Sequence, residues 1–121
     1  MSRLKLIAGG PKTGKTTSAG PQAKHTDDMG TDREFFSRRV EQLAKELPWA
    51  HGVIEGVIVP HALREALKDP HRRFDDVEVE FLKAAKTPLT KGQATMAKGI
   101  QTVWNQVKPE LVKRGAKVTE R

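Results

Sequence analysis

The sequence predicts an α/β domain in which parallel strands alternate with helices, with about five strands in a mainly parallel sheet. Short β-branched apolar runs, typical of buried strands, alternate along the chain with segments whose apolar residues recur at helical spacing. The length of 121 residues suits one domain and leaves no room for a second. Cysteine is absent, so the fold cannot depend on disulfides or on thiolate-bound metal.

The first part of the chain predicts two short strands and a helix. Residues 3–8 form an apolar run that ends at Gly9 and Gly10, which is typical of a strand entering a turn. Residues 24–28 can form the tip of a second strand. Thr31 then begins a capping box, and the helix behind it carries its apolar residues at steps of four, three and four: Phe36, Val40, Leu43 and Leu47.

The middle of the chain predicts a strand, a helix and another strand. Residues 52–59, GVIEGVIV, are apolar on both faces and suit an interior parallel strand. Pro60 suits the first turn of the helix that follows, and Asp69 with Pro70 ends it. Residues 76–82 alternate, which predicts a strand with its valines and its phenylalanine on a covered face and its two glutamates on the other.

The last long element is a predicted helix that begins with a second capping box at Thr90. Its apolar residues keep helical register from Met96 to Leu111, and its tryptophan is expected in the core. Pro109 lacks a backbone donor and is expected to kink or split this helix. Gly115 suits a helix stop, and the residues behind it can add an edge strand.

Charge is unevenly distributed along the chain. Residues 1–26 carry five basic groups and no acid, residues 27–82 have a net charge of −5, and residues 83–121 have a net charge of +7. Basic ends of this kind suit a polyanion, such as nucleotide phosphates or a nucleic-acid backbone, and equally suit a solvated surface. No apolar run approaches the ~20 residues of a membrane span, and the first residues fit a signal peptide poorly, so we expect a cytoplasmic protein with no membrane partner.

Residues 9–16, GGPKTGKT, match G-x-x-x-x-G-K-[ST], the phosphate-binding P-loop. The glycines let the backbone turn its amides inward, Lys15 can place an ammonium between the β- and γ-phosphates, and Thr16 can ligate Mg²⁺. The motif therefore predicts that the chain binds ATP or GTP with Mg²⁺. The alternative is a glycine-rich turn with a surface lysine. The expected nucleotide-binding residues are Gly9, Gly10, Pro11, Lys12, Thr13, Gly14, Lys15, Thr16 and Thr17.

With this loop, the acidic pair Asp27 and Asp28, the strand 53–56 and the segment 62–64, the chain resembles the small P-loop kinases. These are the nucleoside, gluconate, shikimate and nucleoside-monophosphate kinases, and the chain is also similar to short kinase-like proteins encoded by bacteriophages. The resemblance implies a P-loop NTPase-like three-layer sandwich, as a single domain over residues 1–121, with strand order 2-3-1-4-5. It implies transfer of the γ-phosphate to a small-molecule or nucleotide acceptor. Lys15, Asp27, Asp28 and Glu55 would then be the catalytic residues.

In this interpretation Asp27 or Asp28 orients the acceptor, and Glu55 is the acid near Mg²⁺ or the acceptor. The resemblance also implies a basic lid, which we expect as a mobile segment at residues 83–92. Candidate contacts to the acceptor or its phosphates are Arg38, Arg64, Lys86 and Lys91, although a solvated surface explains them too. The chain departs from the family because the segment 83–91 contains no arginine and only about nine residues separate the P-loop from the acidic pair.

Two further functions stay open at this point. The small size and the weak lid suit a nucleotide-binding regulatory protein with little catalysis, a phage-type host modulator with a protein partner. The basic C-terminal third suits a nucleic-acid-binding module, although no helix-turn-helix or zinc signature supports it. GTPases carry an N/T-K-x-D tetrapeptide that this sequence lacks, and its four histidines show no metal-ligand spacing.

Overall fold

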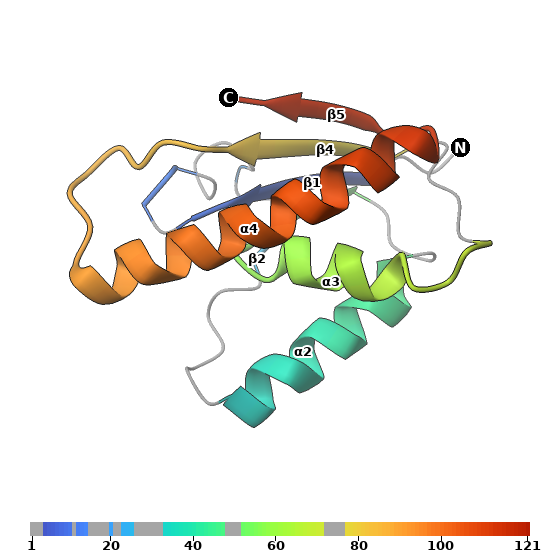
Figure 1. The fold of residues 1–121 in the computed structure, drawn as a ribbon, viewed down its shortest axis with the longest axis horizontal. Helices are drawn as coiled ribbons and strands as arrows, with labels where there is room; N and C mark the ends of the chain where they lie inside the picture. The colour runs from blue at the N-terminus through green and yellow to red at the C-terminus, as the bar shows by residue number, and fades with distance from the viewer. Residues whose placement is uncertain are drawn as a thin grey trace.

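The computed structural model describes residues 4–10, 12–14, 20, 23–25, 33–47, 52–71 and 77–121. Within these ranges it has five strands, β1 (Leu4–Gly9), β2 (Lys24–His25), β3 (Gly52–Glu55), β4 (Val77–Leu82) and β5 (Lys117–Glu120). Its three helices there are α2 (Arg33–Glu46), α3 (Val59–Ala66) and α4 (Lys91–Lys113). Strands and helices alternate, which confirms the predicted α/β class (Figure 1).

The five strands form one sheet in the order β2-β3-β1-β4-β5, and every neighbouring pair is parallel. β1 is interior and pairs with β3 on one side and with β4 on the other. The order is the one that the resemblance implies. Because all strands run the same way, their carboxyl ends share one edge of the sheet, and there β1 leads into residues 10–14.

One hydrophobic core lies between the sheet and the three described helices. Figure 1 shows α2, α3 and α4 on the same side of the sheet. Alternate strand residues point into this core and meet the apolar faces of the helices: Leu6, Ala8, Ile54, Val79 and Phe81. Trp104 of α4 is fully buried and stacks on Phe81, with 4.8 Å between ring centroids, so its predicted place in the core is confirmed.

The strand predicted over residues 52–59 is shorter than expected. β3 ends at Glu55, although the Gly56 amide still donates to the Ile7 carbonyl at 3.1 Å. The chain then turns, and α3 begins at Val59 with Pro60 in its first turn. A buried helix start and an interior strand have the same apolar composition, which is why periodicity could not place this boundary.

α4 is a single unbroken helix, so the expected split at Pro109 is wrong. Proline has no N–H, so one carbonyl in the preceding turn of the helix has no amide to accept from. Pro109 is exposed, and water can bond to that carbonyl on this face. Both reciprocal bonds of the capping box join Thr90 and Gln93, and Gly115 follows the helix with φ 92°, as predicted.

No residue from 91 to 99 is buried, and Met96, predicted on the apolar face, is 48% exposed. Within the described ranges, no helix is both long and apolar enough to cross a bilayer.

Candidate functional site

The glycine-rich loop begins where β1 ends, at the carboxyl edge of the sheet. Lys12 has φ 60° and Gly14 has φ 83°, so the chain reverses through left-handed residues. The buried Thr13 hydroxyl donates to the Gly10 carbonyl at 2.9 Å and closes the turn. Turns of this kind can gather backbone N–H groups around an anion. The remaining motif residues lie outside the described residues, so their geometry stays a prediction: Pro11, Lys15, Thr16 and Thr17.

Close packing against backbone requires glycine at position 9, and the left-handed backbone conformation, φ 83°, favours glycine at position 14. An ideal Cβ at Gly9 would lie 2.8 Å from the Leu82 carbonyl oxygen and 2.8 Å from Thr13 Oγ1. An ideal Cβ at Gly14 would lie 2.9 Å from Lys86 Nζ. The backbone carbonyl at the end of β4 cannot move aside as a side chain can, so a larger residue at position 9 would separate the loop from β4.

Residues 83–90, which we call the connector, link β4 to α4 and are bonded to the loop. The Lys86 amide donates to the Lys12 carbonyl at 2.8 Å, and Lys12 Nζ donates to the Pro88 carbonyl at 3.1 Å. At its start, the Lys83 amide donates to the Arg121 carbonyl at 2.9 Å. Figure 1 shows the connector, yellow to orange, at the same end of the sheet as the loop. The predicted lid, 83–92, is therefore the connector plus the start of α4, and its mobility stays a prediction.

Four basic residues were predicted to contact phosphates or the acceptor, and Lys86 is the one whose contact with the loop the structure shows. Its ammonium lies against Gly14, and it forms no ion pair with the residues that the structure describes. Lys91 is exposed at the start of α4, and Arg38 is exposed on α2. Arg64 is exposed in the last turn of α3, which leads away from the carboxyl edge of the sheet.

Glu55 is the last residue of β3 and is only 1% exposed. It pairs with Ile7 of β1, two residues before Gly9, which is about 7 Å along the strand. Since its neighbour Ile54 points into the helical core, Glu55 points to the opposite face of the sheet. Asp27 and Asp28 lie outside the described residues, so their convergence with Glu55 stays a prediction.

A second buried carboxylate, Glu80 of β4, lies on the same face and was missed by sequence reasoning. It pairs with Ile7 from the other side and is 2% exposed, so its predicted solvent-facing position is wrong. Lys5 Nζ lies 3.3 Å from Glu80 Oε2 and Arg121 Nε lies 3.2 Å from Oε1. A buried carboxylate needs such counter-charges. In the sequence, the signal for a buried carboxylate was Lys5, the lone lysine within the apolar first strand. Through these two ion pairs, Glu80 connects β4 to β1 and to the residue that follows β5.

Glu120 of β5 fastens the start of the connector to the body of the fold. The Trp104 indole donates to Glu120 Oε1 at 2.7 Å, and Lys108 Nζ donates to Oε2 at 2.7 Å. Lys83 Nζ lies 3.1 Å from the same Oε2. These contacts, that of Lys108 foremost, lower the pKa of Glu120 from 4.5 to about 2. One carboxylate thus joins α4, β5 and the first residue of the connector.

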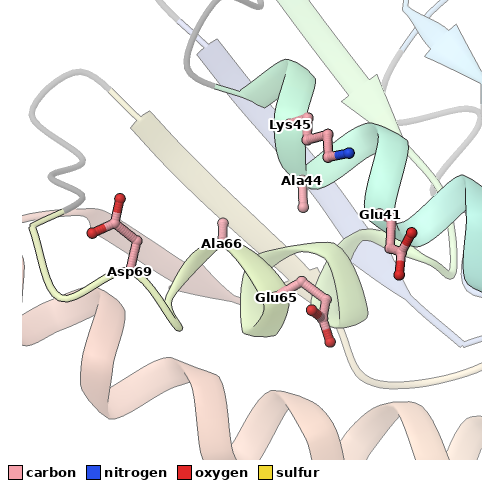
Figure 2. Close-up of a pocket in the computed structure, with 6 residues that line it drawn as sticks. All are labelled: Glu41, Ala44, Lys45, Glu65, Ala66 and Asp69. Atoms are coloured by element: carbon pink, nitrogen blue, oxygen red, sulfur yellow. The ribbon is translucent and has the colours of Figure 1, made fainter.

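A shallow groove of about 360 Å³ between α2 and α3 is distinct from the loop (Figure 2). Lys45 and Asp69 line the groove near the ends of α2 and α3. These helix ends lead back to the amino ends of the strands, so the groove lies opposite the loop. Its lining holds three acids and one lysine, which disfavours a phosphate ligand. The lining residues are Glu41, Ala44, Lys45, Glu65, Ala66 and Asp69.

The Mg²⁺ ligands predicted from the sequence are Thr16 and Glu55. A hydroxyl and a carboxylate are oxygen donors of the type that Mg²⁺ prefers, and one or two protein ligands suffice when phosphates and water complete the shell. Glu55 pairs with Ile7, two residues before Gly9, and its role as a Mg²⁺ ligand stays a prediction, as does that of Thr16. In the part of the chain that the structure describes, no three His, Asp or Glu residues cluster in a way that could hold a metal ion.

Comparison with protein-family models and with curated protein sequences finds no match to this chain. The resemblance to P-loop kinases therefore depends on the motif and on the strand order.

Proposed function

We propose that the protein binds a nucleoside triphosphate with Mg²⁺ at residues 9–16 and transfers its γ-phosphate to an acceptor. One observation carries the proposal: a P-loop sequence leaves the carboxyl end of the interior strand β1 in a parallel sheet of order β2-β3-β1-β4-β5. In open α/β sheets, ligands bind at the carboxyl ends of the strands, where the strand order reverses. A P-loop NTPase-like three-layer sandwich is the fold we propose. A cysteine-free chain suits the reducing cytoplasm, where such nucleotides occur.

The proposed reaction assigns a role to each predicted catalytic residue. The loop amides and Lys15 hold the phosphates, and Thr16 with Glu55 would hold Mg²⁺, which when bound neutralises part of the phosphate charge. Asp27 or Asp28 accepts the proton of the acceptor hydroxyl as its oxygen attacks the γ-phosphorus. The bond from that phosphorus to the β-phosphate oxygen breaks, and the nucleoside diphosphate leaves with the electron pair.

The direct test is calorimetric titration of the wild type and of Lys15→Ala with ATP and GTP in the presence of Mg²⁺. We expect the substitution to weaken nucleotide binding by well over tenfold, since it removes the ammonium at the phosphates. The exposed Lys113, at the far end of α4, supplies the matched control, and Lys113→Ala should bind like the wild type. Equal nucleotide affinity for the wild type and Lys15→Ala would contradict the proposal. A γ-phosphate transfer screen against nucleosides, nucleotides, sugars and polynucleotide ends then identifies the acceptor.

A nucleotide-binding regulatory protein with little turnover is the second candidate, and the exposed connector favours it. Residues 83–88 are all exposed, and the connector offers lysines but no arginine to close over phosphates. An open phosphate site does not exclude water, which disfavours transfer of the γ-phosphate to an acceptor. Tight nucleotide binding without transfer to any acceptor, and with only slow release of inorganic phosphate, would select this candidate.

A further inference from the structure

The start of α4 carries an exposed face of one charge. Lys91, Ala94, Thr95 and Lys98 recur at helical spacing, so they share one side of the helix, and all four are exposed. We call these four residues the basic face. The two lysines lie two turns apart, about 10.5 Å along the helix, with small side chains between them. From residue 83 to residue 109 the sequence contains lysines but no aspartate or glutamate, so no acid on this stretch offsets their charge.

The groove between α2 and α3 has the complementary properties. Its floor consists of two small buried residues, Ala44 and Ala66, which let another helix come close. Around this floor stand Glu41, Glu65 and Asp69 with a single lysine, which gives the lining a net charge of −2 (Figure 2). Grooves of this kind receive helices whose contact residues recur at i, i+3, i+4 and i+7, which is the spacing of the basic face.

The two surfaces lie at opposite ends of the sheet. The basic face belongs to the part of α4 beside the loop, where an ideal Cβ at Gly10 would lie 3.0 Å from Ala97 Cβ. The groove lies toward the amino ends of the strands, and β1 alone spans about 20 Å between these ends. A molecule therefore cannot place its basic face in its own groove, and the occupant has to come from another molecule.

We infer that the groove receives the basic face of a second copy of this chain, in a head-to-tail contact. Lys91 and Lys98 reach the acids of the groove, while Ala94 and Thr95 lie on its alanine floor. The charge of the groove favours this occupant over a nucleic acid, whose phosphates the acids would repel. Because the two contacting surfaces differ, the contact is heterologous and can repeat from one molecule to the next. This inference is independent of the proposed nucleotide site.

The size of the two surfaces sets the expected strength. A face of two helical turns buries less than the about 800 Å² per partner of a standard interface, so we expect a weak, reversible association at ~0.1–1 mM protein. At ~150 mM salt the Debye length is about 8 Å, which screens the repulsion between whole chains of net charge +7. Ion pairs in direct contact are screened much less. The association should therefore be measurable at this salt concentration.

The test is a charge exchange, followed by sedimentation equilibrium of the full chain. Lys91→Glu/Lys98→Glu makes the basic face acidic, and Glu41→Lys/Glu65→Lys makes the groove basic, so each variant opposes like charges and should stay monomeric. The wild type should reach at least about 1.5 times the monomer mass at ~1 mM. An equimolar mixture of the two variants should recover at least about half of that rise, since each groove then meets a face of opposite charge.

Lys117→Glu is the control, because Lys117 is exposed on the edge strand β5, outside both surfaces. It should associate like the wild type. A wild type that stays monomeric at ~1 mM would overturn the inference. So would association that survives either double variant, a mixture that stays monomeric, or an equal loss in Lys117→Glu, which would attribute the effect to the general positive field.

A second readout uses only the wild-type chain and does not depend on the folding of a variant. Equal amounts of ¹⁴N- and ¹⁵N-labelled protein are cross-linked with a carbodiimide, which joins lysine amines to carboxylates in direct contact. Mass spectrometry should find mixed-isotope pairs that link Lys91 or Lys98 to Glu41, Glu65 or Asp69. Intermolecular pairs confined to other residues, or no mixed-isotope pairs at ~1 mM protein, would overturn the contact.

Discussion

Replacement of Glu120 by glutamine should destabilise the protein in a way that depends on pH. Glu120→Gln keeps the size of the side chain and an oxygen that can accept from the Trp104 indole. It removes the negative charge that receives the ammonium groups of Lys108 and Lys83 at 2.7 and 3.1 Å. Because Lys83 is the first residue of the connector, the variant also loosens the segment that reaches the loop.

The magnitude follows from the pKa of Glu120, which folding lowers from 4.5 to about 2. If the charge were fully shielded from water, this shift would correspond to about 3 kcal/mol at neutral pH. The Glu120 side chain is 19% exposed and both lysines are about half in solvent, so we expect about 2 kcal/mol. A lowered carboxyl pKa stabilises the fold above pH 4.5, and this contribution disappears as the pH falls toward about 2.

The assay is urea unfolding followed by circular dichroism, for the wild type and Glu120→Gln at neutral pH and at about pH 3. The difference in free energy of unfolding should be about 2 kcal/mol at neutral pH and less than half of that at about pH 3. Glu65→Gln is the matched control, because Glu65 pairs with the exposed Lys68 just after α3, and such ion pairs contribute less than about 1 kcal/mol. An equal loss at both pH values, or no loss at neutral pH, would refute the assigned role of the charge.

Three further predictions concern the core, the site acid and the connector. Trp104→Ala should lower the free energy of unfolding by about 3–5 kcal/mol, since it removes the fully buried ring stacked on Phe81. Denaturant unfolding measures this loss, and a loss below about 1 kcal/mol would contradict the packing. Glu55→Gln should reduce γ-phosphate transfer more than tenfold and leave nucleotide affinity within about twofold, which radiolabel transfer and calorimetry separate; unchanged transfer would remove Glu55 from the catalytic set. In hydrogen exchange, residues 83–92 should become protected when a non-hydrolysable nucleotide binds; high protection already present in the free protein, and unchanged by nucleotide, would exclude a mobile lid.

Much of the fold is predictable because the relevant signals are local. Helical spacing from Val40 to Leu47 and the capping box at Thr90 depend on neighbouring residues, and the structure confirms both helices. The boundary of β3 was not predictable in the same way, since Ile58 and Val59 are buried whether they continue a strand or begin a helix. Met96 keeps helical register but is exposed. No residue of α4 before Ile100 is buried, so the first part of this helix does not pack on the core.

The same distinction between local and long-range signals applies to the candidate site. The P-loop motif is contiguous, so sequence alone locates it after β1. The burial of Glu80 depends on Lys5 and Arg121, which reach it only after three strands have paired, and no local pattern encodes that meeting. The contact of Lys86 with Gly14 likewise depends on where the connector leaves β4.

The left-handed conformation of Lys12 links the evolution of the loop to that of the connector. Glycine would adopt φ 60° without the roughly 1–2 kcal/mol that a residue with a Cβ loses there. A glycine at this position would, however, remove the bond from Nζ to the Pro88 carbonyl. In variants of this chain that carry glycine at position 12, the connector is therefore expected to change in length or to gain a new attachment. The two segments, about 75 residues apart in sequence, should diverge together.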